Sequence, residues 1–341
     1  MGSEMCIRDS QIILEPEGID TEEIYASGLG NSLPMEVQIP FVRSVAGLEE
    51  AEIMRPAYAI EYDYVNPVQL YTTLETKLIG GLYMAGQING TSGYEEAAAQ
   101  GMWAGINAAS KIQKRPPFLL DRSEAYMAVM VDDLVTRGTN EPYRMFTSRA
   151  EYRLLLREDN ADQRLMEKGF ELGLIDSDTM DEMKVRQRQI AEEVKRIKGT
   201  TIHPSPKVNE QLAKRDSSPI TQPTTLGQLL KRPELHYEDL ENLDGRREAI
   251  DDRIAEKAEI EIKYEGYIQR QLKEAEKFRN LERMKIPPEF DYGGVHGLSN
   301  ELREKLAAVK PISLGQASRV PGITPAALST LMVYLKKAGS L

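Results

Sequence analysis

The sequence predicts an α/β domain over residues 11–115, followed by a mainly α-helical domain over residues 118–341. Three observations support this fold class. An apolar strand, a glycine-rich turn and a helix follow one another within residues 81–110. Helical periodicity dominates from Ser123 onward. The paired prolines Pro116 and Pro117 separate the two parts, because consecutive prolines stop a helix.

The α/β domain is expected to contain three strands and two helices. The apolar stretches predict strands over Gln11–Glu15, Tyr58–Tyr64 and Gly81–Gln87, a helix within Leu33–Leu48 and a second helix over Tyr94–Ser110. The second helix carries many small side chains, which would let it pack closely against a sheet: Ala97, Ala98, Ala99, Gly101, Ala104 and Gly105.

The turn before this second helix is a candidate ligand site. Gly86, Gly90 and Gly93 allow tight turns and a close approach of backbone to a ligand. The helix that starts near Gly93 offers free N–H groups and a positive dipole end to an anion or to an electron-rich ring oxygen. A dinucleotide pyrophosphate needs a second turn of the form G-x-G-x-x-G. Gly28-Leu-Gly30 lacks the third glycine and is interpreted as an ordinary loop.

The helical domain is expected to begin with a helix capped by Asp121 or Ser123 and running toward Leu134. A charged amphipathic helix follows over Thr179–Lys198, with apolar positions at Met183, Val185, Ile190, Val194 and Ile197. Thr200–Thr225 is rich in Pro, Ser and Thr and is interpreted as a surface connection.

A long helix is predicted over Ala249–Met284, ended by the prolines at 287 and 288. Its apolar residues lie on or near one stripe: Ile254, Ala258, Ile262, Tyr264, Ile268 and Leu272. Three shorter helices are expected to form a final subdomain over about residues 290–341.

Composition excludes several classes of protein and site. The chain of 341 residues carries a net charge of −11, which argues against general adhesion to nucleic acid but leaves room for a local basic patch. Its single cysteine, Cys6, cannot form an intrachain disulfide, and its three histidines are far apart in sequence, so we expect no metal site. No apolar run approaches the roughly 20 residues that span a bilayer. These features suit a reducing cytoplasm.

Residues 1–10 do not lead smoothly into the strand-like residues that follow them, and no apolar signal-peptide core is visible there. We interpret this stretch as a junction or truncation leader and exclude it from the fold prediction.

The segment 143–164 alternates aromatic, basic and acidic residues. If Tyr152–Arg157 forms a strand, Arg153 and Arg157 share a face and Leu154 and Leu156 point to the core. If it forms a helix, Arg149, Arg153 and Arg157 line one side. In either form clustered guanidinium groups suit phosphate contacts, and nearby tyrosines can stack on bases. The alternative is an internal ion-pair network with the interleaved acids.

Two further segments allow two interpretations each. Val320–Leu328 resembles a helix–hairpin–helix turn, with Thr324 as a cap and Pro325 at the first helical position. It could offer N–H groups to phosphates, with Lys336 and Lys337 nearby, or belong to a bundle that docks a partner protein. Arg55–Asp63 could line a cleft or form a half-buried strand.

Several of these strings closely resemble the MnmG (GidA) family, the flavoproteins of the tRNA uridine 5-carboxymethylaminomethyl modification system. The resemblance covers about residues 11–341. It rests on five strings, at Ala85–Gly101, Glu141–Asp162, Lys263–Ile268, Gly297–Asn300 and Gly315–Arg319.

The resemblance implies a partial Rossmann-type FAD-binding domain before the helical domain, use of NADH, and a homodimer in the cytoplasm. It implies RNA binding, and modification of the tRNA wobble uridine together with a partner GTPase of the MnmE type and a folate one-carbon donor. Reduced flavin would carry the redox chemistry. By resemblance, Gln87 is the best single FAD contact, with Asn89, Gly90, Gly93, Tyr94 and Glu95 beside it. The basic side chains expected to contact tRNA are Arg144, Arg149, Arg153, Arg157, Lys336 and Lys337.

The departures from the family pattern matter for activity. The 341 residues hold no G-x-G-x-x-G fingerprint, no counterpart of the family's NADH-binding insertion and none of its functional cysteines, and Cys6 lies in the suspect leader. The catalytic residues are therefore not assigned. We interpret the chain as a C-terminal fragment that does not catalyse the reaction alone. The alternative is a non-catalytic module that binds tRNA and the partner.

Overall fold

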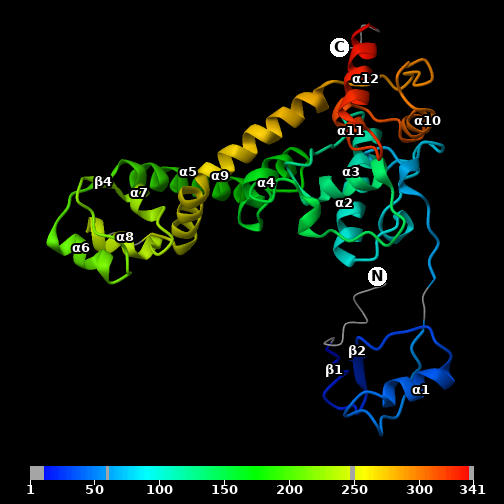
Figure 1. The fold of residues 1–341 in the computed structure, drawn as a ribbon, viewed down its shortest axis with the longest axis horizontal. Helices are drawn as coiled ribbons and strands as arrows, with labels where there is room; N and C mark the ends of the chain where they lie inside the picture. Colours follow the sequence, from blue (N-terminus) through cyan, green and yellow to red (C-terminus); the bar gives the residue numbers. More distant parts are fainter. Residues whose placement is uncertain (1–10, 59–60, 246–249, 338–341) are drawn as a thin grey trace. The chain divides into compact units, whose positions relative to one another are not determined.

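The computed structural model describes residues 11–58, 61–245 and 250–337, which form two compact units (Figure 1). The first unit is Met1–Asp63 and the second is Tyr64–Leu341. The order of elements follows the predicted fold class, a small α/β region followed by helical domains. Among the described residues, no helix is long and apolar enough to cross a bilayer.

The first unit is a hairpin and a helix with little core. Strands β1 (Ile13–Pro16) and β2 (Ile24–Ser27) pair antiparallel, and helix α1 (Met35–Arg43) lies within the predicted range. The buried Gln38 ties α1 to a following loop, because its side-chain amide both donates to and accepts from the backbone of Ala57. The strand predicted over Tyr58–Tyr64 is absent from its described residues, and residues 59 and 60 lie outside the description.

The second unit opens with short turns and two packed helices, α2 (Tyr94–Ile112) and α3 (Tyr126–Arg137). The strand predicted over Gly81–Gln87 is wrong. Tyr83 forms only a single bridge with Glu75, and the chain enters the 3-10 helix η3 (Gly86–Asn89) through a left-handed Gly86. A short 3-10 helix, η2 (Pro67–Gln69), precedes these elements.

Helix α2 buries a face different from the one its small residues suggested. Ala98, Gly101 and Gly105 are exposed, whereas Trp103 is buried with polar neighbours on the same face: Glu96, Gln100 and Asn107. The described residues near α2 form no extended sheet against which small residues would pack, since the only two sheets described have two short strands each. Trp103 instead packs against α3, Leu70, Leu74 and an edge of Phe118.

The predicted cap of α3 is also wrong. The residue before the helix is Ala125, which makes no side-chain cap. The carboxylate of Asp121 instead accepts hydrogen bonds from the Ser123 backbone and from Arg279, so it serves a turn and a tertiary contact.

The middle of the second unit is a helical assembly built on two long helices. Helix α5 (Ser177–Gly199) matches its prediction, except that Val185 is 50% exposed. The connection predicted over Thr200–Thr225 contains regular structure, a short β3–β4 pair (Thr201–Ile202 with Thr224–Thr225) and helix α6 (Pro206–Ala213). The remaining elements are η4 (Thr147–Arg149), η5 (Glu158–Asn160), α4 (Ala161–Glu171), α7 (Leu226–Leu230) and α8 (Tyr237–Asp244).

Helix α9 (Asp252–Arg283) connects this assembly to the rest of the unit (Figure 1). Its first half buries Ile254, Ala258 and Ile262; the last two pack in one core with α5, α7 and α8. Its second half buries Ala275 against Tyr152 and Leu155. Tyr264 and Leu272, predicted on the apolar stripe, are exposed.

The chain ends in the predicted set of three short helices, α10 (Asn300–Val309), α11 (Leu314–Ser318) and α12 (Pro325–Lys337). They share a separate hydrophobic core that includes Leu306, Leu314 and Leu331. Serine or threonine side chains cap each helix, and Thr324 caps α12 with Pro325 at its first position as predicted.

One lysine ties the start of the second unit to this terminal bundle. The Lys77 ammonium donates to the carbonyl oxygens of Val309 and Ala308 at the end of α10, at 2.5 and 3.3 Å, and to that of Val68 at 2.7 Å. These contacts satisfy carbonyls that a helix end leaves unpaired and complement its dipole. Burial, with the nearby charge of Lys310, lowers the pKa of Lys77 from 10.5 to about 8.

We expect Lys77 to make stability depend on pH in a defined window. Between pH 8 and 10.5 the unfolded lysine holds its proton while the folded one releases it, so the unfolded state binds more protons and stability rises with pH. Relative to Lys77→Met, the wild-type free energy of unfolding should therefore increase across this window in urea titrations. The exposed Lys336→Met serves as control, and a pH-independent gap between wild type and Lys77→Met would contradict the prediction.

Candidate functional site

The glycine-rich turn is held from inside by buried amides. Gln100 is fully buried on α2, and its carbonyl oxygen accepts from Gly86 N and from the Asn89 side chain, at 3.2 and 2.9 Å. Its amide nitrogen donates to the Thr91 hydroxyl at 2.9 Å. The side chain of Asn89 also donates to the Met84 carbonyl oxygen. These bonds fix the turn before any ligand arrives.

Two of the glycines are required by neighbouring side chains. A Cβ at Gly90 would lie 2.7 Å from both Tyr64 Cε2 and Thr139 Cγ2, and this glycine has a left-handed φ of +80°. A Cβ at Gly93 would lie 1.8 Å from Glu96 Oε2. The contacts that demand glycine at these positions are therefore internal to the protein.

The first turn of α2 combines free N–H groups with carboxylates. Gly93 at the N-cap makes no side-chain cap, and Glu95 and Glu96 follow in the first turn. Glu96 is 5% exposed; its Oε1 accepts from Met145 N at 2.8 Å and from Arg144 Nε at 3.3 Å. Burial raises the pKa of Glu96, but the Met145 hydrogen bond and Arg144 outweigh it and hold the pKa below its usual value.

Two buried oxygen atoms at this turn lack hydrogen-bond partners among the described residues, Asn89 Oδ1 and Glu96 Oε2. Buried polar atoms are normally paired, so such atoms are candidates for a ligand or water contact. Gln87 is half-buried and its side chain makes no hydrogen bond within the described residues, while Tyr94 is 93% exposed and Glu95 is exposed. Asn89 is fully buried, so its side chain acts inside the turn.

The segment 141–157 lies directly against this turn. Tyr143 N donates to the Gly90 carbonyl oxygen at 2.7 Å, and Thr91 and Tyr143 form a parallel bridge. Neither form considered for Tyr152–Arg157 occurs, because these residues are in turns. Tyr152, Leu155 and Leu156 are buried there, whereas Leu154 is only half-buried.

The four arginines of this segment have different environments. Arg144 pairs with Glu96, and Arg157 pairs with Asp159 at 2.8 Å. Arg149 lies 4.3 Å from the centre of the Tyr143 ring and donates to the Arg144 carbonyl oxygen, while its side chain meets no carboxylate among the described residues. Arg153 is exposed, and no described residue pairs with it. Arg149 and Arg153 are thus the cations with unneutralised charge.

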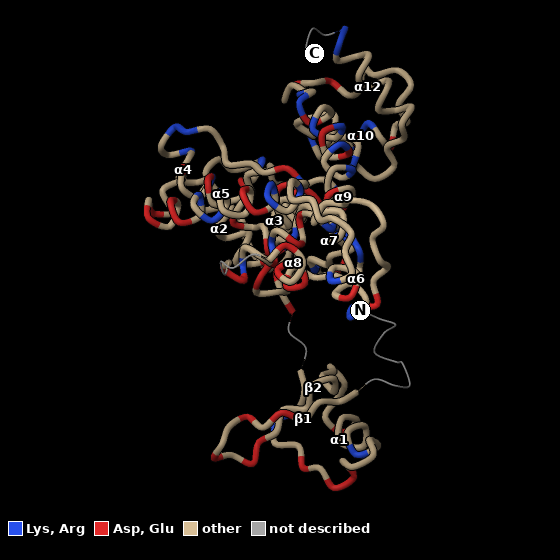
Figure 2. Tube along the Cα trace, turned by 90° about the vertical axis from the view of Figure 1, so that its left-hand side faces the viewer, with Lys and Arg blue, Asp and Glu red and all other residues tan. Residues whose placement is uncertain are grey.

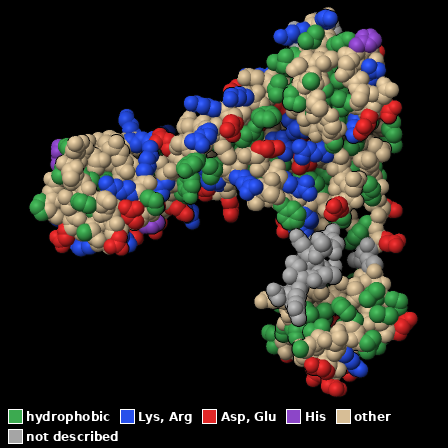
Figure 3. All heavy atoms as spheres, in the orientation of Figure 1, with side chains coloured by type: hydrophobic (Ala, Val, Ile, Leu, Met, Phe, Trp, Pro, Cys, Tyr) green, Lys and Arg blue, Asp and Glu red, His purple; other side chains and the backbone are tan. Residues whose placement is uncertain are grey.

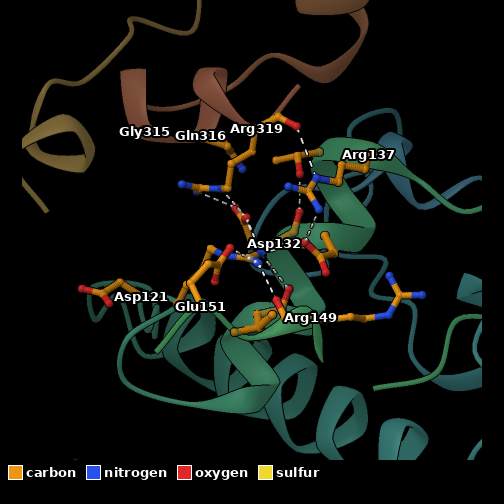
Figure 4. A network of polar contacts seen from close by, with 12 residues as sticks. Asp121, Asp132, Arg137, Arg149, Glu151, Gly315, Gln316 and Arg319 are labelled. Carbon is orange, nitrogen blue, oxygen red and sulfur yellow. Dashed lines mark hydrogen bonds and ion pairs between the residues drawn. The ribbon is translucent and has the colours of Figure 1, made fainter. Parts of the chain in front are cut away.

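A buried charge network lies behind this segment (Figure 4). Arg122 pairs with Asp132, Asp133 and Glu151, at 3.0, 2.7 and 2.8 Å. Arg319, from the terminal bundle, also binds Asp132, with a 2.8 Å Nη2–Oδ1 bond. Burial lowers the pKa of Arg122, but Asp132 and Asp133 outweigh it, so the net shift is upward.

The network extends to Tyr143 and to α9. The Tyr143 hydroxyl donates to Asp133 at 3.0 Å, and burial, followed by the Asp133 charge, raises the pKa of Tyr143. Arg319 also pairs with Glu282 at 2.6 Å. A cavity of about 280 Å³ adjoins these residues, but each charged side chain that lines it is already in an ion pair. The network is therefore structural in character.

The basic residues at the C-terminal end lie in the last turn of α12. Lys337 lies 5.7 Å from the Tyr334 ring centre, and Lys336 and Lys337 are both exposed. Thr324 caps the opposite end of this 13-residue helix. The turn and the lysines are therefore separated by the length of the helix, about 18 Å at 1.5 Å per residue, and do not form one site.

Sequence reasoning missed the residues that hold the site together: Glu96, Gln100, Arg122, Asp132, Asp133, Glu282 and Arg319. The available signal was the spacing of Glu96, Gln100 and Asn107, which repeats a polar residue on one helical face. Polar residues at helical spacing ordinarily indicate a solvent-facing side, and here that face is buried.

Comparison with known families identifies the chain. The family model "Glucose inhibited division protein A" matches residues 7–116. Two models of the tRNA modifying enzyme MnmG/GidA, for its C-terminal helical domain and its C-terminal helical bundle, match residues 177–272 and 274–340. The chain belongs to the MnmG/GidA family. The second and third matched segments meet within α9, which joins the helical assembly to the terminal bundle.

Individual members of the MnmG/GidA family match nearly the whole chain. The tRNA uridine 5-carboxymethylaminomethyl modification enzyme MnmG of Syntrophobacter fumaroxidans is 63% identical over 96% of the chain, and that of Caldicellulosiruptor saccharolyticus is 54% identical over 96%. The match covers 51% and 52% of these relatives. The chain thus spans about half the length of the curated relatives it matches.

A solved structure supports the fold. Aquifex aeolicus GidA, in its form II crystal, superposes with a TM-score of 0.83 at 47% identity, covering 95% of this chain and 51% of that one. At this similarity the arrangement of elements around the glycine-rich turn is that of a GidA protein.

Removing one member of the charge network should destabilise the fold strongly. Arg319→Met leaves Asp132 and Glu282 without a shared cation, and breaking a buried pair costs about 3–5 kcal/mol. Lys305→Met removes an exposed pair with Glu301 and should cost little, because exposed pairs are screened by solvent. Urea unfolding followed by circular dichroism would measure both values, and equal losses would show that the network is not buried in solution.

Proposed function

We propose that this chain acts in FAD-dependent modification of the tRNA wobble uridine, at which a carboxymethylaminomethyl group is placed on C5, together with a partner GTPase of the MnmE type. The observation that carries the proposal is the direct contact between the glycine-rich turn and residues 141–157, which we name the arginine segment. Met145 N and Arg144 Nε both donate to Glu96, and Tyr143 N donates to the Gly90 carbonyl oxygen. A cofactor turn and an RNA-binding segment joined in this way would place flavin and nucleic acid side by side.

The residues of the turn fit part of a flavin. The free N–H groups at the start of α2 suit an electron-rich carbonyl oxygen of the ring, whereas the carboxylates of Glu95 and Glu96 disfavour a pyrophosphate there. The unpartnered Oε2 of Glu96 is an acceptor for an N–H donor. Gln87, whose amide is unengaged, would hold the cofactor with Gly93, Tyr94 and Glu95, while Asn89 and Gly90 keep the turn in shape. Flavin, when bound, supplies the redox chemistry.

Other parts of the proposal concern partners. We propose that NADH is the reductant, that the protein works as a homodimer in the cytoplasm, and that the terminal bundle of α10–α12 docks the GTPase. The bundle suits docking because it has a core of its own and an exposed apolar side chain, Val333, beside the lysines of its last turn.

A second candidate function is a binding module for tRNA and the partner without redox activity. It is favoured by one observation, the lack of a G-x-G-x-x-G fingerprint in the 341 residues. In this case we expect NADH to leave added flavin oxidised in the presence of this chain. Bleaching of the flavin absorbance by NADH would exclude the second candidate.

The flavin proposal is tested by fluorescence titration of the 341-residue chain with FAD. We expect saturable binding, and Gln87→Ala should weaken it by about 3- to 10-fold through loss of one hydrogen bond. The matched control is Gln113→Ala at the exposed far end of α2, which should bind as wild type does. Equal affinities of all three proteins would remove Gln87 from the site.

The RNA proposal is tested by the salt dependence of tRNA binding. Arg149→Ala with Arg153→Ala removes two unneutralised cations, so the slope of log K against log salt should fall by about 1.4–1.8. The matched control, Lys184→Ala with Arg188→Ala, removes two exposed cations from α5 and should leave the slope near its wild-type value. An unchanged slope in the arginine variant would assign Arg149 and Arg153 to structural roles.

A further inference from the structure

One stretch of helix α9 has a side that no other element of the protein covers among the described residues. Ile262 and Ala275 are buried, but between them no residue is buried and most are exposed. Figure 3 shows Lys and Arg side chains along the upper edge of this part of the second unit. The uncovered side carries Tyr267, Arg270, Lys273 and Lys277, all exposed, and we name these four residues the α9 basic face.

The three cations of the α9 basic face form a row. Their spacing of i, i+3 and i+7 places Arg270, Lys273 and Lys277 on one side of the helix. The row is about 10 Å long at 1.5 Å rise per residue. One exposed carboxylate, Glu274, lies on the same side, so cations exceed acids there.

These cations are unpaired, in contrast to their neighbours. Within the described part of the chain, no carboxylate forms an ion pair with Arg270, Lys273 or Lys277. In contrast, Arg279 and Arg283, which follow within two turns of Lys277, both pair with Glu276. The chain as a whole is acidic, with a net charge of −11, and Figure 2 shows acidic and basic residues interleaved along its helices. A row of free cations on such a protein suits a polyanion.

An aromatic ring accompanies the row. Tyr267 is 58% exposed, and the Arg270 guanidinium carbon lies 5.8 Å from its ring centre. An exposed ring beside a guanidinium group is an arrangement on which unpaired bases stack, and it adds a preference for nucleic acid over an acidic protein surface.

The arginine segment packs against the same stretch of α9, on a different side of the helix from the cation row. Leu154 N donates to Gln271 Oε1 at 3.1 Å, and the Tyr152 ring meets the edge of Phe278 at 6.4 Å between centres. Arg153 lies between these two contacts in sequence and is exposed. The turn that carries Arg153 is therefore fixed to the same stretch of α9.

We propose that the α9 basic face binds RNA, with the cation row on consecutive backbone phosphates and Tyr267 stacked on an unpaired base. This inference rests on the proposed function and deepens it, because it extends the RNA contact from the arginine segment along α9.

The test is anisotropy titration of labelled tRNA against the full 341-residue chain at several salt concentrations. The triple variant Arg270→Gln, Lys273→Gln and Lys277→Gln keeps good helix formers and should lower the log–log slope by about 2.1–2.7. Tyr267→Leu should weaken binding about 5-fold or more at fixed salt with little change in slope. Circular dichroism confirms that each variant is folded.

Matched controls come from the same chain. Lys184→Gln, Arg188→Gln and Lys195→Gln remove three exposed cations from one side of α5. Tyr264→Leu removes an exposed ring that lies about 120° or more around α9 from each cation of the row. Both controls should bind like wild type. The inference is overturned if the α9 triple variant keeps the wild-type slope, or loses no more of it than the α5 control. In that case wild-type binding still supports the proposed function, whereas failure of the wild-type chain to bind tRNA would overturn both.

Discussion

The second unit depends on the burial of one carboxylate, Asp132, between two arginines that come from distant parts of the sequence. Arg122 precedes the helix that carries Asp132, and Arg319 belongs to the terminal bundle. A buried charge is tolerated only with its partners in place, so the bundle can dock in one arrangement. Glu282 shares Arg319, which ties the end of α9 to the same point. Hydrophobic packing alone, being non-directional, would allow the bundle to slide.

The same principle operates on a smaller scale at the glycine-rich turn. The side-chain amide of Gln100 lies inside the turn and forms hydrogen bonds through both its oxygen and its nitrogen. The Glu96 carboxylate accepts a hydrogen bond from Met145 N and so holds the arginine segment against the start of α2. The turn is therefore preorganised by polar side chains from a helix that follows it. Glycine is needed at 90 and 93 because Tyr64, Thr139 and Glu96 occupy the space that a side chain would take. The side chains that leave no room for a Cβ atom at Gly90 and Gly93 therefore also hold the turn in the conformation that suits a ligand.

A structural feature could be predicted from the sequence where it depends on residues close together in the chain, and not where it depends on tertiary contacts. Periodicity and caps are local, so the helices at 94–112, 177–199 and 252–283 and the capped turn at Thr324 follow from sequence. The strand expected over Gly81–Gln87 failed because an apolar run forms a strand only where a neighbour pairs with it, and here a single bridge is available. The pairing of Arg122 with Asp132, or of Leu154 with Gln271, joins residues by tertiary folding, and no local pattern encodes it. For the same reason the sequence alone does not distinguish the four arginines expected to contact tRNA in segment 143–164. The fold pairs Arg144 and Arg157 with carboxylates and leaves Arg149 and Arg153 without one among the described residues.

This separation of paired from unpaired cations is the basis of the proposed polyanion site on an acidic protein. Arg122 and Arg319 form ion pairs with buried carboxylates, and these pairs make the fold rigid. The positive charge of both arginines is cancelled at short range. Where charge remains, at Arg149, Arg153 and the α9 basic face, the cations lie on elements that those buried pairs hold still. Surface charge on a fixed scaffold loses little conformational freedom on binding, so its attraction is retained in the affinity. If RNA binds as proposed, the acidic remainder of the surface would repel it elsewhere, so the net charge of −11 would favour binding at Arg149, Arg153 and the α9 basic face.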